Sequence, residues 1–280
     1  MSAVPAPVRT GPAWTDRLKV TQWRVFASEW TKFRSLRSTL WTLGVGVVLG
    51  IGFSLIAATV TGARWAHMSF AERAGRHPLD IALVGVRFSQ LAFGVLGVLV
   101  ISGEYSTGMI RASIGAVPKR LPVLWGKIVV FGVVTLLLGI PVVLAGFFGS
   151  QAILEHAYHI TYLKLSFGAP GVARAVLGGA LYLTVMGIFA LALGAITRNT
   201  AGGLTLFAAI VFVIPPLLFI LPTSWNDAIS KYLPSNAGAE IFQMNHGPND
   251  LHPWPGFLLF CGYTAIVVAI AAVLLVRRDT

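Results

Sequence analysis

Charged residues are scarce in this chain of 280 residues, at 11%, whereas a soluble domain carries about a quarter. Hydrophobic residues make up 56%, and the mean hydropathy is +0.77. Long apolar runs with so little charge are typical of a polytopic membrane protein. The net charge of +11 does not predict nucleic-acid binding, because the basic residues lie at the ends of apolar runs, where they contact lipid phosphates. We expect membrane lipid, and no nucleic acid, as a partner.

Cysteine and the common catalytic motifs are also nearly absent. The single cysteine, Cys261, excludes an intrachain disulfide. A P-loop is missing, since the only Gly-Lys pair, Gly126-Lys127, has Leu121 where the first glycine is required. H-E-x-x-H and G-x-S-x-G do not occur, and no carboxylate pair lies inside an apolar run. We therefore expect no catalytic residue, metal site or cofactor in this chain. If the chain is a transporter, its energy must come from a partner.

Two local features leave alternatives open. Glu155, His156 and His159 form an H-x-x-H group, for which an ordinary loop is favoured over a metal site. Arg87 is the only charge well inside an apolar run. Extension of its long stem toward the membrane surface is favoured over a role in substrate binding.

The N-terminal part is predicted to lie outside the spans. Residues 1–13 contain three prolines and are expected to be a disordered tail. Residues 1–38 hold seven Lys/Arg before the first long apolar run, which argues against a signal peptide. Residues 14–38 are expected to form an amphipathic helix on the membrane surface. Its apolar stripe is Trp23, Phe26, Trp30 and Phe33, and its polar side is Arg24, Ser28, Thr31, Lys32 and Ser35. A simple anchor and a functional helix both fit this pattern.

Six apolar runs are long enough to cross a bilayer, which needs about 20 residues each. The predicted spans are 39–61, 82–103, 125–149, 174–196, 201–221 and 256–276. The fold class is therefore all-α and polytopic, with one transmembrane domain over residues 39–280. The positive-inside rule places both termini in the cytoplasm, because the segment before the first span and the loop after the second carry the densest Lys/Arg.

Glycine and proline mark special positions in the spans. Gly46 and Gly50 form a small-xxx-small face in the first span, whose partner is either another span or a second chain. Pro215-Pro216 is expected to kink the fifth span. Two short helices that dip toward the membrane are predicted in the last outer loop, at 223–233 and 237–245, separated by a break at Pro234-Ser235.

The polar interval 103–127 lies between the second and third spans and forms a cytoplasmic elbow. Ser106-Thr107 is expected to cap a short helix over Met109–Ile114, which Gly115 and Pro118 end. Met109, Ile110 and Ile114 give this helix an apolar edge beside Arg111. From the pattern alone, a docking helix and an ordinary connecting loop are equally acceptable.

The chain resembles the permease subunits of ABC-2-type exporters from about residue 20 onward. The resemblance rests on E-W-T-K-F-R-S-L-R-S-T at Glu29–Thr39, G-E-Y-S-T-G-M-I-R at Gly103–Arg111, Pro118-Lys119-Arg120, Gly126-Lys127, and L-P-S-N-A-G at Leu233–Gly238. The Gly-Glu-Tyr stretch is its most specific part.

This resemblance implies a connecting helix that touches an ATPase, a coupling helix seated in a cleft of that ATPase, and short helices at an outer gate. The connecting-helix residues would be Glu29, Lys32, Phe33 and Arg34. The coupling residues would be Glu104, Tyr105, Gly108, Met109, Ile110, Arg111 and Ile114. The outer gate would include Pro215, Pro216, Trp225 and Pro234. Glu104 is also expected to pair with a basic residue of the connecting helix.

The implied assembly has two permease chains, a homodimer or a homologous heterodimer, that meet through the first and fifth spans, where Gly46 and Gly50 lie. Two separate cytoplasmic ATPase subunits would hold ATP and Mg²⁺. The permease itself would lie in the cytoplasmic membrane of a bacterium. The expected cargo is small and amphipathic, drug-like, peptide or lipid-like. The alternatives are a non-transporting membrane subunit that docks a cytoplasmic partner, and a membrane-embedded enzyme that acts on lipid.

Overall fold

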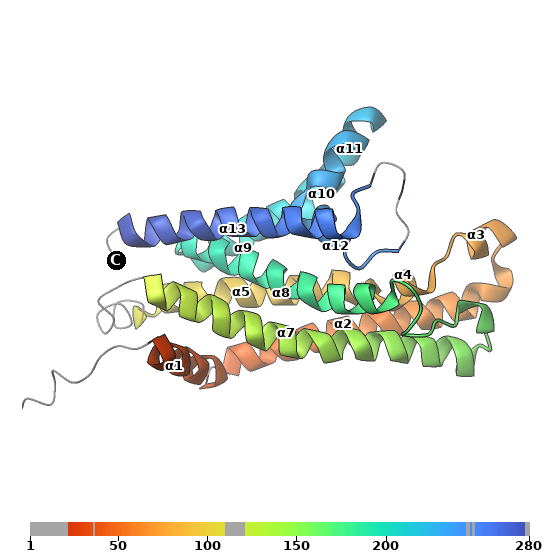
Figure 1. Cartoon of the computed structure of the whole chain (residues 1–280), viewed down its shortest axis with the longest axis horizontal. Coiled ribbons are helices and arrows are strands. Elements are labelled where there is room, and N and C mark those ends of the chain that lie inside the picture. Colours follow the sequence, from red (N-terminus) through yellow and green to blue (C-terminus); the bar gives the residue numbers. More distant parts are fainter. Residues whose placement is uncertain (1–21, 36, 110–120, 245–246, 248–249, 278–280) are drawn as a thin grey trace, which may run out of the picture.

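The long apolar runs form long helices that lie side by side in an elongated bundle (Figure 1). The computed structural model describes residues 22–35, 37–109, 121–244, 247 and 250–277, and these ranges contain no strand. Six helical segments in them are long and apolar enough to cross a membrane: Ser38–His67, Pro78–Ser106, Leu121–Ala157, Val172–Thr197, Thr200–Ile220 and Pro253–Arg277. The prediction of an all-helical fold with six candidate spans is confirmed.

The candidate spans are built from the following elements. Before and within the first two lie α1 (Gln22–Ser35), α2 (Arg37–Arg64), η2 (Trp65–His67), α3 (Phe70–Ala74), α4 (Pro78–Ala82) and α5 (Val84–Ser106). The third and fourth comprise α7 (Leu121–Ala152), η3 (Ile153–Ala157), η4 (Thr161–Leu163) and α8 (Val172–Thr197). The remainder comprises α9 (Thr200–Ala208), η5 (Ala209–Val213), α10 (Ile214–Leu217), η6 (Leu218–Ile220), α11 (Thr223–Ile229), η7 (Ser230–Tyr232), α12 (Pro234–Ala239) and α13 (Pro253–Arg277).

Helix α8 is the centre of the bundle and packs against α5, α7 and α13. Its apolar window is 78% buried, compared with 28% for the first and last candidate spans. Glycines allow this close packing: a Cβ added at Gly97 of α5 would lie 2.2 Å from the carbonyl oxygen of Gly187 in α8. Helix backbones approach closely where small residues face each other, and α8 therefore holds its neighbours through backbone contact.

The small-residue face of α2 packs against α5 of the same chain. A Cβ at Gly85 would lie 1.7 Å from the carbonyl oxygen of Gly50, so only glycine fits there. The hydroxyl of Ser89 donates a hydrogen bond to the carbonyl oxygen of Gly46, at 2.8 Å. Of the two partners that the sequence leaves open for Gly46 and Gly50, the structure therefore places another span at this face.

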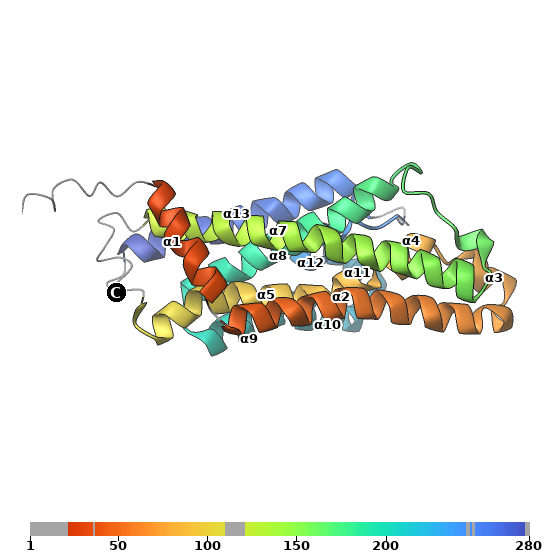
Figure 2. The ribbon, with the colours of Figure 1, turned by 90° about the horizontal axis from the view of Figure 1, so that it is seen from below.

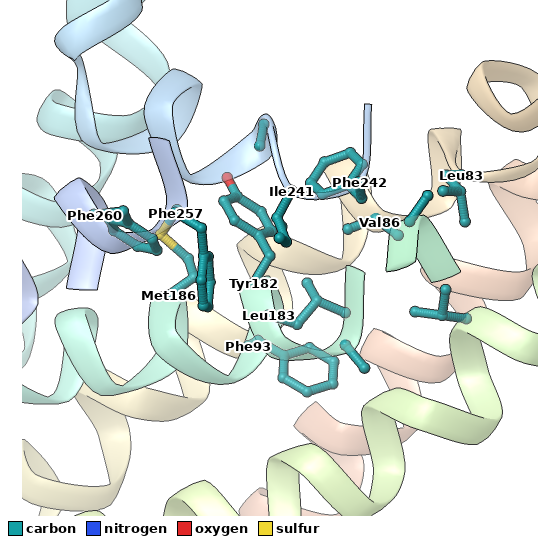
Figure 3. Close-up of a cluster of buried hydrophobic side chains, with 14 of the residues drawn as sticks. Leu83, Val86, Phe93, Tyr182, Leu183, Met186, Ile241, Phe242, Phe257 and Phe260 are labelled. Atoms are coloured by element: carbon teal, nitrogen blue, oxygen red, sulfur yellow. The ribbon is translucent and has the colours of Figure 1, made fainter. Parts of the chain in front are cut away.

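Aromatic side chains join α8 to the segment around α12 and to α13 (Figure 3). The ring of Tyr182 lies 5.2 Å from Phe242 and 5.8 Å from Phe260, measured between centroids. Tyr182 also donates a hydrogen bond to the side-chain oxygen of Gln90 in α5. Because a buried phenol needs a partner for its hydroxyl, this contact fixes α5, α8 and the α12 region relative to one another.

The fifth candidate span is an irregular helix that contains two adjacent prolines. A π-helical turn, η5, precedes Pro215 and Pro216, which lie in the first turn of α10. Such a turn accommodates prolines, since they lack the N–H that a regular helix would require. Neither α10 nor α11 has a buried residue, and Figure 1 shows these helices projecting away from the bundle.

The prediction for the two short helices after the fifth span is only partly correct. The first is present as α11, which continues into η7. The second is wrong in its boundaries: α12 begins at Pro234, where a break was expected, and ends at Ala239. The reason is that proline is favoured in the first turn of a helix, where its missing N–H costs nothing. Gln243 and Met244 follow without helical structure.

Candidate functional site

Helices α1, α5 and α7 meet at one end of the bundle, which we call the α1 end (Figure 2). Charged side chains of the three helices contact each other there. Helix α1 contributes Glu29 and Lys32, the last turn of α5 contributes Glu104, and the second turn of α7 contributes Lys127. Because α5 ends and α7 begins at the same end of the bundle, Glu104 and Lys127 are neighbours in space although 23 positions apart. We call these four residues the ion cluster.

Every charge in the ion cluster has two partners of opposite sign. The Nζ of Lys127 lies 2.7 Å from Oε2 of Glu29 and 2.7 Å from Oε1 of Glu104. The Nζ of Lys32 lies 2.7 Å from Oε1 of Glu29 and 3.1 Å from Oε1 of Glu104. The expected pairing of Glu104 with a basic residue of the first helix is therefore present, and two positive charges balance two negative ones.

The ion cluster is largely closed to solvent. The exposed fractions of the side chains are 2% for Lys127, 5% for Glu29 and 6% for Glu104, with Lys32 at 28%. Removing an isolated charge from water is costly, and a buried cluster is tolerated only if its charges are paired. Deleting one member would leave a buried charge without compensation, so the geometry of α1, α5 and α7 is interdependent.

Lys32 is the one member that water reaches, and it remains charged. Its partial burial lowers the pKa, but the hydrogen bonds and charge attraction of Glu29 and Glu104 outweigh that effect, so the net pKa is raised. The positive charge of Lys32 is thus retained over the whole physiological range.

Apolar residues surround the ion cluster and hold α1 in place. The ring of Phe33, one turn after Glu29, meets Phe131 of α7 edge to face with centroids 6.4 Å apart. Val100 and Val130 line the same small cavity as the charges. Edge-to-face aromatic pairs add to the free energy gained from burial, so both packing and charge fix α1 against α7.

The predicted division of α1 into an apolar and a polar side differs from the structure at Lys32, and its membrane-surface placement stays a prediction. Phe33 is buried and Phe26 half-buried, but Trp23 and Trp30 are exposed by 78% and 49%. Lys32, expected on the polar side, turns toward the bundle. The physical reason is that a lysine can turn toward the bundle when carboxylates there pair with its charge.

The segment expected to contact an ATPase is described only up to Met109. Tyr105 lies under the guanidinium of Arg198, 5.5 Å from its ring centroid, and Met109 is 40% exposed. Gly108 has a φ of +71°, the left-handed conformation that ends helices and suits glycine. The hydroxyls of Ser106 and Thr107 donate to the carbonyl oxygen of Gly103 and so serve the end of α5. Ile110, Arg111 and Ile114 lie outside the described residues.

The remaining predicted site residues do not join the ion cluster. Arg34 is exposed on α1. Of the residues expected at an outer gate, Pro215, Pro216 and Trp225 lie on the arm formed by α10 and α11. Pro234 begins α12, which packs against α13. Trp225 is 63% exposed, so the arm presents a large apolar side chain.

A second buried acid, Glu240, lies after α12, near the start of α13. A Cβ at Gly256 would lie 3.1 Å from its Cβ, and its carbonyl oxygen accepts a hydrogen bond from Arg174 at 3.4 Å. Burial and the negative charge of Asp250 raise the pKa of Glu240 to about 7, against the opposing effect of Arg87. The guanidinium of Arg87 lies 5.9 Å from the ring centroid of Phe242.

The H-x-x-H group does not form a metal centre in the described residues. No group of three His, Cys, Asp or Glu side chains there is arranged to hold a metal ion. Glu155 instead pairs with Lys164, at 2.5 Å.

Lys127 was not predicted as a site residue, although it is the most buried charge of the ion cluster. The available signal was its place near the start of an apolar run, where a lysine normally reaches water. What sequence alone does not show is that α1 crosses beneath this position and supplies a carboxylate.

Comparison of the sequence with protein-family models and with curated proteins found no relative. The resemblance to ABC-2-type permeases therefore remains a hypothesis that rests on the motifs given above.

Proposed function

We propose that this chain is the membrane permease subunit of an ABC exporter of the ABC-2 type. It moves a small amphipathic, drug-like, peptide or lipid-like cargo out across the cytoplasmic membrane of a bacterium. Two copies, or one copy with a homologous chain, assemble with two ATPase subunits that hold ATP and Mg²⁺. The α1 end faces the cytoplasm in this proposal, in agreement with the density of Lys/Arg before the first span.

The observation that carries the proposal is the ion cluster. Glu104 lies two turns or less before Met109, at the start of the segment proposed to contact the ATPase, and Lys127 follows that segment. Both side chains are tied to Glu29 or Lys32 of α1 by contacts of 2.7 to 3.1 Å. A displacement of the segment between α5 and α7 would therefore pull on α1 and both spans together.

The mechanism follows from that rigidity. ATP binding closes the ATPase dimer and pushes on the segment around Gly108–Ile114. Because breaking the buried ion cluster is costly, the push is transmitted to α5 and α7 as a unit. Helix α2 follows, since Gly46 and Gly50 are packed against α5. The α10–α11 arm, which has few contacts with the bundle, is the element free to open the outer side for the cargo.

The first test is purification of the tagged chain from native membranes in mild detergent. We expect a P-loop ATPase to accompany it in about equimolar amount and to be lost when residues 108–114 are replaced. Replacement of Trp225, on the opposite arm, is the control and should leave the ATPase bound. Absence of any ATPase would contradict the proposal and favour a membrane-embedded enzyme that acts on lipid.

A second test separates a transporter from a subunit that only docks a partner. Inverted vesicles that contain the chain and its ATPase should accumulate cargo when ATP is added. Glu104→Gln should weaken this transport more than it weakens ATPase binding, because it disturbs the cluster and leaves the docking segment intact. Equal transport by Glu104→Gln would contradict the role given to the ion cluster.

A further inference from the structure

An apolar groove runs along the membrane-facing side of α7, α8 and α13. Helices α7 and α13 both pack on α8 but barely touch each other, which leaves a space between them. The groove has a volume of about 330 Å³. Trp125 and Ile128 line it from α7, Val185 from α8, and Ala265, Ala269 and Ala272 from α13. Alanine at these three positions of α13, where larger side chains would fill the space, keeps the groove open.

The groove lies at the depth of the bilayer, and its wall needs no polar ligand. All its lining residues belong to candidate membrane spans. The hydroxyl of Thr264, the polar side chain in its wall, already donates to the carbonyl oxygen of Phe260 at 3.0 Å. Water is not held in a site without polar partners. An empty apolar groove also lacks dispersion contacts on one side of its wall. A hydrocarbon in the groove would make these contacts without leaving a polar group unpaired.

The size of the groove selects a single hydrocarbon chain. The stretch of α13 from Cys261 to Ala272 is about 16 Å long at 1.5 Å per residue. A volume of about 330 Å³ spread over that length gives a mean cross-section of roughly 20 Å². One extended chain of methylenes, with neighbours about 4 Å away, fits this cross-section. A second transmembrane helix, about 10 Å across, does not fit between α7 and α13, because these two helices already touch each other, and only its side chains could enter the groove.

The α1 end of the groove is marked by a tryptophan. Trp125 is 49% exposed at that end of the groove, and tryptophan favours the level of the headgroups in a bilayer. A lipid whose chain lies in the groove therefore has its headgroup at the α1 end.

We propose that the groove between α7 and α13 binds one acyl chain of a phospholipid, with its headgroup at the α1 end beside Trp125. The site is separate from the face through which a second permease is expected: Figure 2 shows α13 along one long side of the bundle and α2 along the other. The inference goes beyond the proposed export function and does not depend on it. A lipid here adds contacts between α7 and α13, which touch each other far less than each touches α8.

Native mass spectrometry of the full-length chain, delipidated in detergent and supplied with dioleoyl phosphatidylglycerol, tests the proposal. The wild type should retain one lipid per chain under conditions that strip the others. Ala269→Phe places a ring in the groove and should lower this occupancy about tenfold, because it removes the space for the chain. Ala269→Leu should give an intermediate loss. Ala269 is exposed, so neither variant overpacks the core.

Ile270→Phe is the matched control, since residue 270 is 46% exposed on the same helix and does not line the groove. It should retain lipid as the wild type does. Equal retention by Ala269→Phe and Ile270→Phe would overturn the proposal and indicate ordinary lipid around the bundle.

A phospholipid with a photoreactive group at the end of its acyl chain locates the bound chain. We expect cross-links on the peptides that contain Val185 and Cys261, and their loss in Ala269→Phe. Cross-links spread equally over α2 would overturn the proposal, as would capture of a second polypeptide at Cys261 by a thiol-reactive cross-linker. None of these outcomes depends on the presence of an ATPase, so failure here is distinguishable from failure of the proposed function.

Discussion

The two buried acid sites of this protein differ in how their charge is neutralised. At the α1 end, Glu29 and Glu104 each contact two ammonium groups at 3.1 Å or less. Near the start of α13, Glu240 is similarly buried, and burial and the charge of Asp250 raise its pKa against the opposing effect of Arg87. Direct pairing keeps a buried carboxylate charged, whereas burial with a weaker counter-charge moves the pKa toward neutral pH. The ion cluster therefore ties three helices together, whereas Glu240 makes the stability of the protein depend on pH.

The largest effect is expected for Lys127→Met. This change leaves two carboxylates facing each other in a buried site with only Lys32 to balance them, so stability should fall by about 3–5 kcal/mol. Unfolding of the detergent-solubilised chain, followed by temperature or denaturant, measures the loss. Lys164→Met is the matched control, because it breaks the exposed pair with Glu155 and should cost at most about 1 kcal/mol. Similar losses in both variants would contradict the structural importance of the ion cluster.

Charge balance can be separated from packing by adding Glu104→Gln to Lys127→Met. The double variant keeps the neutral Glu29–Lys32 pair at 2.7 Å and removes the excess negative charge. It should recover about 1–3 kcal/mol of the loss, as a double-mutant cycle over neighbouring residues can reveal. Additive losses would mean that Lys127 stabilises the protein through its stem and not through its charge.

The pH response is expected at Glu240. Its pKa of about 7 in the folded chain lies above the ordinary value of 4.5. Unfolding releases the proton between these values, so the contribution to stability is complete below about pH 4.5 and is lost as the pH rises through 7. Between pH 5 and 8 the unfolding free energy should fall by roughly 1–3 kcal/mol from this group.

Glu240→Gln should remove that part of the pH dependence, and melting curves at pH 5, 6, 7 and 8 check it. Arg87→Gln sharpens the test, because loss of the positive neighbour should raise the pKa further and move the midpoint to higher pH. The groups that act on Glu240 include Arg87 of α5 and Asp250, and Arg174 of α8 donates to its carbonyl oxygen. A pH profile identical in wild type and Glu240→Gln would refute this account.

The smallest effect is expected for Lys32→Met. Lys32 is 28% exposed, and Lys127 keeps a contact with both carboxylates when it is absent. Loss of a partly solvated charge-assisted contact should cost about 0.5–1.5 kcal/mol. Thermal unfolding beside Lys127→Met gives the comparison directly. A loss as large as that of Lys127→Met would show that the stability contributed by the ion cluster depends on the number of its charges and not on how deeply each is buried.

Sequence reasoning was most successful where one local property decides the structure. Run length and hydropathy were enough for the six candidate spans, since a bilayer requires about 20 apolar residues. It failed at Pro234, because proline is compatible both with a break and with the first turn of a helix. It also missed the burial of Glu29 and Lys32, because their partners lie on α5 and α7, far away in the sequence.

The sequence by itself determined a helical protein with six long apolar helices, a charged elbow after the second, and a carboxylate at Glu104 suited to an ion pair. Only the tertiary structure decided that α1 crosses the ends of α5 and α7, that Lys127 is buried between Glu29 and Glu104, and that α7 and α13 leave a groove over α8. The physical reason is the distance along the chain between the residues that decide each property. Hydropathy and helix length depend on neighbours along the chain, whereas an ion pair between residues 98 positions apart depends on how whole helices pack.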